Sequence, residues 1–496
     1  MKKKDLLKLI VGASLAVVLV ISVPLMSGCA APAPTPTPEP TPTPTPGPEE
    51  PVPAGEVPAG LSADEVGVLG QLPDQEIGVT YPIGETINVG FLAALSGPDA
   101  GWGLPGLCGN NIWIDAVNKC GGLLVGGTRY PLKMWEFDDE TVGSKALQGA
   151  RELVLEHDVK FINAIGGNCA DATHPFLSDN GVVYASLVPT DCRPDRPYLV
   201  AGGDITPQCN MLNLRLASMV LPTQKELGRP WTYAVTTQDC IMSHMNGAWE
   251  VGAAIATGFD VVYEVFFPTE MTDFAPVITD IMATKPDVIS LCEAWPTYQT
   301  LMWEQLYLLG YDGVVIQNYA DWEANLQKIP PEYAAARYGI DSFPLMDDPW
   351  WGDPSWNASF TRAWNARYGP GAPEDVKRHM TGIDWDHVVW LMPWTIGAQL
   401  WGIDHPGEGF PNNDQILEAL RAADSFSTCL GPGHMSGMEM FGIDNMIEQP
   451  VPMCMFSLAA NDKRIVAQYN FEPWFQAQKD VMIGTVEERG MMYYQR

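Results

Sequence analysis

The chain has 496 residues, of which 46% are hydrophobic, and its 60 acidic and 28 basic side chains give a formal net charge of −32. A chain this acidic lacks the basic surface that binds phosphate groups, so we exclude nucleic acid as a partner. The length exceeds what one compact core accommodates, which predicts two lobes.

Residues 1–28 have the pattern of a lipoprotein signal peptide. Three lysines at 2–4 precede an apolar run, Leu6 to Met26, in which Lys8 is the one charged residue. The sequence Met-Ser-Gly-Cys at 26–29 resembles a bacterial lipobox, which implies cleavage and a lipid on Cys29. The alternative is an uncleaved transmembrane anchor. Both place the rest of the chain outside the cytoplasm, and the lipid form anchors it to the outer face of the cytoplasmic membrane.

Residues 29–60 join Cys29 to a linker rich in proline and threonine. Proline at this frequency prevents helix and sheet, so we expect an extended, semi-rigid spacer of roughly 3.1 Å per residue. Residues 61–85 form a lead-in to the folded part. No second apolar stretch of about twenty residues follows the first, so no other membrane span is expected.

From residue 86 the chain alternates short β-rich runs with segments of helical periodicity. We expect strands at Ile87–Leu92, Leu132–Phe137, Val159–Ile165, Val182–Ser186, Trp231–Thr236, Val261–Phe267, Val288–Leu291 and Val314–Gln317. We expect helices at Leu104–Asn118, 142–157, 207–220, Met245–Thr257, 298–309 and Asp386–Leu400. Such alternation predicts an α/β fold with parallel sheets and helices on both faces.

In parallel sheets a ligand lies beyond the carboxyl ends of the strands. This rule nominates seven loops, at 95–103, 138–141, 166–173, 186–191, 237–243, 292–297 and 318–322. The loops fall into two runs, so we expect two lobes that close on a cleft, with crossings near 205, 320 and 440. Lobe I would comprise 86–205 and 321–440, and lobe II 206–320 and 441–496. The Trp-rich segment 349–356 is expected to pack in the core, or else to form a surface flap or a partner contact.

The sequence Gly101-Trp-Gly-Leu-Pro-Gly106 matches the dinucleotide-binding pattern G-x-G-x-x-G. In that fingerprint the first glycine directly follows the strand, and an acid follows about twenty residues on. Here Gly101 lies nine positions beyond Leu92, and the acids Asp138 and Asp139 lie more than thirty positions further along. The spacing argues against dinucleotide binding, and no cofactor is predicted.

Residues 87–127 resemble the start of the periplasmic branched-chain amino-acid binding proteins, the type I solute-binding family of ABC importers. The resemblance covers residues 87–320 well and rests on the order and spacing of several short motifs. These motifs are Ser96-Gly97-Pro98, Trp102-Gly103, Ala116-Val117-Asn118, Gly121-Gly122, and the stretches 135–140, 166–175, 185–191, 272–291 and 306–313. The resemblance implies a two-lobed periplasmic binding protein fold with a hinge, a small-molecule ligand in the cleft, and the permease of an ABC transporter as partner.

The resemblance also implies where the first lobe would bind. Small-residue loops at 168–173 and 186–190 would hold a ligand carboxylate through backbone N–H groups, which short side chains leave accessible. The residues carried over are Asn168, Cys169, Ala170, Asp171, Ser186, Pro189 and Thr190, with Trp102 as an aromatic wall. The alternative for Trp102 is a surface hydrophobe near the hinge. Asp171 departs from the family pattern and would repel a carboxylate unless it points away or is protonated.

On the second lobe, the positions that grip a ligand ammonium in the amino-acid binders correspond to Met242 and Thr297 here. The expected clamp is therefore missing, and Glu293 could supply the acid unless it is a strand-end residue facing solvent. Trp295 and Tyr319 would add aromatic walls. We expect an amino acid, an amide, or an aromatic or hydrophobic carboxylate as ligand.

Other chemistries are weakly supported. The seven histidines show no zinc-ligand spacing, no G-x-S-x-G elbow is present, and Cys169 with His174 is poorly spaced as a nucleophile and base. Asp384 and Asp386 would act as helix-start acids around Trp385, which could reach the cleft. Beside Cys29 nine of the ten cysteines remain, an odd number, with Cys169–Cys192 and Cys429–Cys454 as candidate disulfides. We expect a monomeric binding protein and no enzyme; a ligand sensor or an exported hydrolase are the alternatives.

Overall fold

The computed structural model describes residues 79–97, 99–166, 168–203, 206–268, 271–345 and 354–492. Several predictions concern residues outside these ranges. They are the signal peptide at 1–28, the lipid site Cys29, the linker to residue 60, most of the lead-in at 61–85, and most of the Trp-rich segment at 349–356.

The first lobe is built on a sheet of eight strands in the order β12-β13-β14-β7-β6-β5-β1-β4. The strands are β1 (Ile87–Ala93), β4 (Leu132–Asp138), β5 (Phe161–Ile165), β6 (Val183–Ser186), β7 (Leu199–Gly202), β12 (Phe426–Thr428), β13 (Gly431–Ser436) and β14 (Met446–Glu448). From β4 to β14 each neighbouring pair is parallel, and β12 and β13 extend the sheet antiparallel.

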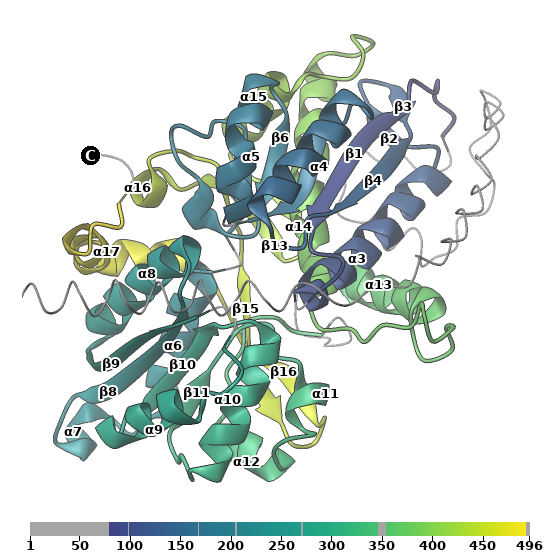
Figure 1. The fold of residues 1–496 in the computed structure, drawn as a ribbon. Helices are drawn as coiled ribbons and strands as arrows, with labels where there is room; N and C mark the ends of the chain where they lie inside the picture. Colours follow the sequence, from purple (N-terminus) through teal and green to yellow (C-terminus); the bar gives the residue numbers. More distant parts are fainter. Residues whose placement is uncertain are drawn as a thin grey trace, which may run out of the picture. The chain divides into compact units, whose positions relative to one another are not determined.

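Helices cover both faces of this sheet (Figure 1). Helices α4 and α5 pack together on one face, and α3 and α14 pack together on the other. The first-lobe helices are α3 (Ala100–Lys119), α4 (Gly143–Leu155), α5 (Asn168–Asp179), α13 (Pro354–Arg367), α14 (Ile383–Asp404), α15 (Asn413–Ala422) and α16 (Met438–Phe441), with a 3-10 turn η2 (Pro189–Asp191). A small hairpin of β2 (Leu123–Val125) and β3 (Thr128–Tyr130) lies against α14.

The second lobe is built on a parallel sheet of four strands in the order β11-β10-β8-β9. The strands are β8 (Trp231–Gln238), β9 (Phe259–Phe267), β10 (Val288–Glu293) and β11 (Val314–Ile316). Its helices are α6 (Gln208–Val220), α7 (Gln224–Leu227), α8 (Ile241–Thr257), α9 (Ala275–Thr284), α10 (Pro296–Leu308), α11 (Trp322–Asn325), α12 (Pro331–Ala336) and α17 (Phe471–Glu488). Helix α8 packs against α6 and α17. The predicted α/β fold with parallel sheets is confirmed.

The chain crosses between the lobes at places that differ in part from the expected ones. Residues 322–336, expected in lobe I, form α11 and α12 in the second lobe, because Trp322, Ile329 and Ala334 are buried in the same apolar cluster as Trp303. The crossing therefore follows residue 341. Strand β14 still pairs with β7 of the first sheet, so the last crossing falls after residue 448.

The last crossing leads into an antiparallel hairpin of β15 (Val451–Ser457) and β16 (Asp462–Tyr469). Asp341 pairs with Cys454 of β15, and Ile340 pairs with Ile316 of β11, so the second crossing starts beside this hairpin. The side chains of Lys463 and Asp341, both buried there, form an ion pair of 3.2 Å.

The G-x-G-x-x-G pattern lies inside a helix, since α3 begins at Ala100. The glycines of this pattern allow α3 to pack closely against its neighbours. A Cβ atom on Gly103 would overlap the carbonyl of Ala94, and one on Gly106 would overlap the ring of His387 in α14. The pattern therefore lets α3 approach a strand end and α14 at a distance that side chains would forbid.

The nine cysteines from Cys108 to Cys454 form no disulfide in the part of the chain that the structure describes. The two candidate pairings, Cys169–Cys192 and Cys429–Cys454, are therefore absent there. None of the described helices combines the length and apolar character needed to cross a membrane.

Candidate functional site

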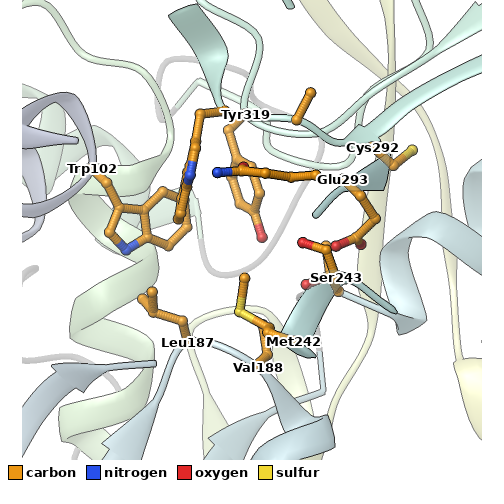
Figure 2. Close-up of a pocket in the computed structure, with 12 residues that line it drawn as sticks. Trp102, Leu187, Val188, Met242, Ser243, Cys292, Glu293 and Tyr319 are labelled. Atoms are coloured by element: carbon orange, nitrogen blue, oxygen red, sulfur yellow. The ribbon is translucent and has the colours of Figure 1, made fainter. Parts of the chain in front are cut away.

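A small cavity lies where loops of the two lobes meet beyond the carboxyl ends of the strands. It has a volume of about 30 Å³, and in Figure 2 Trp102 and Glu293 stand on opposite sides of it, with Tyr319 between them. Its lining residues are Trp102, Leu187, Val188, Thr206, Gln238, Met242, Ser243, Cys292, Glu293, Ala294, Trp295 and Tyr319. We call it the inner cavity.

A second cavity, of about 310 Å³, adjoins the first and is called the outer cavity. Both are lined by Trp102, Leu187, Gln238, Met242 and Trp295. The outer cavity is lined in addition by Ala93, Ala94, Asp99, Asp139, Glu140, Thr141, Gly166, Asn168, Cys169, Cys240 and Tyr298. The two together form one site that extends from the buried Glu293 outward.

Three aromatic rings surround the inner cavity. The Trp102 ring meets the Tyr319 ring edge-on, with centroids 4.6 Å apart, and meets the Trp295 ring at 5.5 Å with an angle of 58° between the planes. Trp102 is 5% exposed and reaches the site from the start of α3, whereas Trp295 precedes α10 and Tyr319 follows β11. The rings come from both lobes, so their arrangement depends on how the lobes meet.

The backbone of Tyr319 is held in an unusual conformation. Its φ is 57°, in the left-handed region that non-glycine residues rarely adopt. The carboxylate of Asp341 accepts hydrogen bonds from the N–H groups of Tyr319 at 3.1 Å and Ala320 at 2.9 Å. Lys463 is paired with the same carboxylate. The ion pair of Lys463 and Asp341 therefore holds the Tyr319 backbone, and with it one wall of the cavity, in place. Backbone strain of this kind is commonly found at functional sites.

Glu293, the last residue of β10, is 5% exposed and is held by amide side chains. Nδ2 of Asn210 donates to its Oε1 at 2.5 Å, and Nδ2 of Asn246 donates to its Oε2 at 3.2 Å. Asn246 in turn accepts a hydrogen bond of 2.9 Å from the hydroxyl of Thr190 in the first lobe. Asn210 also donates to Glu250 at 2.9 Å, so two buried carboxyl groups share one amide donor.

The pKa values of both glutamates are raised. Burial, followed by the charge of Glu250, raises the pKa of Glu293 to about 8, although its amide and hydroxyl donors oppose this. Burial also raises the pKa of Glu250 to about 7, and Tyr233 and Asn210 donate to it. At neutral pH Glu293 is therefore mostly protonated in the empty site, and a group that supplies positive charge would ionise it.

Asp99 and Asp139 give the outer cavity its acidic character. Burial is the main cause that raises the pKa of each carboxyl. Asp139 is 3% exposed and accepts the backbone N–H of Thr141 at 2.8 Å. Burial and the charge of Asp139 also raise the pKa of the Cys169 thiol, which disfavours the thiolate that a nucleophile needs.

Seven of the predicted site residues line these cavities: Trp102, Asn168, Cys169, Met242, Glu293, Trp295 and Tyr319. Five others lie outside both linings: Ala170, Asp171, Ser186, Pro189 and Thr190. Asp171 points to Arg196 and Arg193, with which it forms ion pairs. Ser186 donates to Asp191 at 2.5 Å, and Thr190 to Asn246.

Most of the lining residues that were not among the predicted site residues could still have been located from the sequence, by their position after strands. Asp99, Asp139, Glu140, Thr141, Leu187, Val188, Gln238 and Ser243 all lie within the segments that the carboxyl-end rule nominated, Gln238 as the last residue of β8 and Ser243 in the first turn of α8. Ala93 and Ala94 fall just before the nominated loop at 95–103. Tyr298, in the first turn of α10, falls one residue outside the nominated loop at 292–297, and Thr206 lies at the first crossing between lobes.

The start of α14 lies behind the site and not in its lining. The Asp384 carboxylate accepts the N–H groups of Thr381 at 2.8 Å and Trp385 at 3.0 Å, as the predicted helix-start role requires. The Trp385 side chain is buried and donates to the carbonyl of Pro344 at 3.1 Å. The ring of His387 packs 5.4 Å from that of Trp102, and burial lowers the pKa of His387 to about 4, so it backs the wall as a neutral ring.

The described residues contain no cluster of three or more His, Cys, Asp or Glu side chains that could hold a metal ion. No Lys, Arg or His is found among the described residues that line the cavities, so a charged ligand group would meet carboxyl groups there and no basic side chain. The site offers aromatic surface, amide and hydroxyl groups, and acids.

A family model described as periplasmic binding protein matches residues 86–453, most of the chain. The chain therefore belongs to the type I periplasmic binding proteins, the branched-chain amino-acid-binding-like family that its motifs predicted. A comparison with curated proteins found no match.

Solved structures share the fold. A solute binding protein of an ABC transporter from Rhodopseudomonas palustris BisB5, in complex with 3,4-dihydroxy benzoic acid, is 16% identical, with a TM-score of 0.60, covering 78% of this chain and 97% of that one. An ABC transporter substrate binding protein from Aeropyrum pernix is 16% identical, with a TM-score of 0.62, covering 80% and 99%. An amino acid ABC transporter substrate-binding protein from Pseudomonas fluorescens Pf-5 is 14% identical, with a TM-score of 0.58, covering 78% and 96%. At such identities the likeness shows the fold alone.

Proposed function

We propose that the protein is an extracytoplasmic solute-binding lipoprotein that captures a small organic molecule between its lobes and delivers it to the permease of an ABC transporter. Lipid on Cys29 would hold it at the outer face of the membrane, and the linker at 29–60 would give it reach. The protein would act as a monomer. It would bind by hinge closure and release the solute unaltered.

The observation that carries this proposal is the interlobe site itself. Its inner cavity combines walls from both lobes, Trp102 and Leu187 from the first and Glu293, Trp295 and Tyr319 from the second. A solute there would contact both lobes at once, so binding would favour the conformation that brings them together. That state is what a permease could recognise.

The acidic side chains that line the site favour some of the expected ligand classes over others. Structural relatives include proteins in complex with hydroxylated benzoic acids and an amino-acid transporter component. In this chain Asp171 is turned toward arginines, yet Asp99, Asp139 and Glu293 line the site. Because no basic side chain is found among the described lining residues, these acids weigh against the carboxylate members of the expected set.

Two other functions share the fold. A ligand sensor would bind in the same way but pass its closed state to a signalling protein, and co-purification with a permease separates the two. An exported hydrolase would need an activated nucleophile. The raised pKa of Cys169 disfavours that role, and turnover assays against amides and esters test it.

A thermal-shift screen of the purified protein tests the proposal. It should include amino acids, amides, amines, aromatic acids and urea derivatives. A ligand at 100 times its dissociation constant adds ~2.7 kcal/mol to the free energy of unfolding. The expected result is a shift for one chemical class and recovery of that compound unchanged. No shift with any class, or recovery of a product, would contradict solute capture.

A further inference from the structure

All of the charged side chains that line the two cavities are acidic, within the part of the chain that the structure describes. Glu140 forms an ion pair with Lys145 at the rim. Among the described residues, no basic side chain forms an ion pair with Asp99, Asp139 or Glu293. The pKa values of these three carboxyl groups are shifted by burial, hydrogen bonds and other acids. A carboxylate solute would therefore meet acidic side chains and no basic partner among the described lining residues, whereas an ammonium group would pair with an acid that it helps to ionise.

We propose that the solute is a small organic cation, an amine without a carboxylate, whose ammonium group lies at Glu293 among the rings of Trp102, Trp295 and Tyr319. This inference rests on the proposed function, because it names the class of solute that the same cavity takes.

The three rings suit a cation. A positive group is attracted to the faces of aromatic rings, most strongly to tryptophan, and the attraction grows when water is excluded. The Trp102 and Trp295 planes are inclined by 58°, and the Tyr319 ring stands at 86° to that of Trp102. Rings at such angles enclose a space from several sides, as a stacked pair does not.

The surroundings of Glu293 supply hydrogen bonds but no positive charge. Asn210 and Asn246 donate neutral amide hydrogens to its two oxygens, and Glu250 adds a second acid nearby. A buried carboxylate is stabilised most by a cation in direct contact. An ammonium at Glu293 would supply it and would be bound through charge-assisted hydrogen bonds.

The volumes limit the shape of the solute. The inner cavity, at about 30 Å³, has room for a group the size of one or two water molecules, as a primary ammonium is. The rest of the molecule would extend into the outer cavity of about 310 Å³. The residues common to both cavities are mainly apolar or aromatic, so the connecting part would be a hydrocarbon chain.

The outer cavity would hold a second positive charge. Asp99 and Asp139 lie there, whereas Glu293 lies in the inner cavity, so the site has acids at both ends and apolar walls between them. A molecule with an amino group at each end would match both. Diamines should therefore bind more tightly than monoamines with the same carbon chain.

Calorimetric titration of the full-length protein tests the inference. Putrescine and cadaverine should bind, and butylamine should bind at least about tenfold more weakly than putrescine. Butyramide and butyrate should show no measurable binding. Binding of butyrate or 4-hydroxybenzoate in place of the amines, or no binding by any amine, would overturn the inference. It would leave the proposed function standing, since that fails if no solute of any class binds or if the bound solute is released chemically altered. Equal affinity for butylamine and putrescine would overturn the role of the outer acids.

Charge-removing variants separate the two ends. Glu293→Gln should lower the affinity for putrescine at least about tenfold, and Asp139→Asn should lower it while leaving the affinity for butylamine unchanged. Glu136→Gln is the matched control, because Glu136 lies exposed on β4 and lines neither cavity. An unchanged affinity in both test variants, or an equal loss in the control, would contradict the assignment. If Glu293→Gln fails to fold, Asp139→Asn decides the question.

Discussion

The hydroxyl of Thr190, in the first lobe, donates a hydrogen bond of 2.9 Å to Oδ1 of Asn246, in helix α8 of the second lobe. Through its Nδ2 the same asparagine donates to Glu293 at 3.2 Å. A contact between the lobes is thus linked by one side chain to the acid at the inner end of the site. Removing the Thr190 hydroxyl should therefore change both the free energy of unfolding and the affinity for the solute.

Thr190→Val should remove this donor while preserving the shape of the side chain. Because Thr190 is 1% exposed, the lost hydrogen bond should lower the free energy of unfolding by about 1 kcal/mol. Urea denaturation measures it. Thr485→Val is the control, because Thr485 is only half-buried on α17 and its hydroxyl donates to Val481 of its own helix; its stability should stay within about 0.5 kcal/mol of wild type. Equal stability of the two variants would show that the contact between the lobes is not formed.

Trp102→Ala should weaken solute binding by removing an aromatic wall. The side chain contacts the rings of Trp295 and Tyr319, so its loss should lower affinity at least about tenfold. Trp135→Ala is the matched control, because Trp135 stacks on His157, with centroids 3.6 Å apart, and lines neither cavity. Far-ultraviolet circular dichroism checks that both variants fold. Unchanged affinity in a folded Trp102→Ala protein would remove this residue from the site.

Lys463→Met should destabilise the protein strongly. Lys463 and Asp341 are 1% and 0% exposed, and the substitution leaves a buried carboxylate that also positions the Tyr319 backbone. Breaking a buried pair from one side costs about 3–5 kcal/mol. Lys160→Met, in an exposed pair with Asp158, should cost less than about 1 kcal/mol. Similar losses in thermal stability for both variants would argue that the pair near the hairpin has no structural role.

Glu293→Gln should change how stability depends on pH. Folding raises the pKa of Glu293 from 4.5 to about 8, so between these values the folded chain holds a proton that the unfolded chain has lost. The free energy of unfolding of the wild type should therefore fall as pH rises through this window. The glutamine variant lacks this titration, and its stability relative to wild type should increase from about pH 5 to about pH 8. If the free energies of unfolding of the two proteins changed in parallel with pH, the pKa of Glu293 would not be raised in the folded protein.

Other titratable groups face Glu293 and are common to both proteins. Glu250 lies on α8, Cys292 beside Glu293 on β10, and Cys240 just before α8, whereas α6 presents the neutral Asn210. Tyr233 of β8 donates its hydroxyl hydrogen to Glu250. The residual pH dependence of the glutamine variant should reflect Glu250, whose pKa is raised to about 7. The difference between the two curves isolates Glu293.

The affinity for a cationic solute should rise with pH. Below about pH 8 the empty site holds Glu293 mainly protonated, and an ammonium must displace that proton to bind a carboxylate. Affinity should therefore increase up to about tenfold per pH unit between about pH 6 and pH 8. Titration calorimetry over this range measures the slope. A neutral or anionic solute would show no slope or the opposite one.

Most of the sheet framework could be predicted from the sequence. The apolar runs at Val288–Leu291 and Val314–Gln317 became β10 and β11 with ends within two residues, because β-branched runs between turns carry a strong local signal. Strands β12 and β14 could not be predicted, since three residues hold little pattern. The pairing of β14 with β7 joins segments more than two hundred residues apart.

The location of the site was predictable, but its side-chain partners were not. The rule that ligands lie beyond the carboxyl ends of parallel strands led to the loops that line both cavities. The turn of Asp171 toward Arg196 and the bond between Thr190 and Asn246 depend on contacts 25 and 56 residues apart in the chain. Local patterns do not record such contacts, so these two residues were placed in the ligand contact set from family resemblance alone.

Equilibrium dialysis of the wild-type protein against a mixture of solutes, followed by mass spectrometry of what is retained, tests the central claim most directly. We expect one amine to be retained at one molecule per chain, to be released chemically unchanged when the protein is denatured, and not to be retained by Trp102→Ala. Retention of no compound, or release of an altered one, would contradict it.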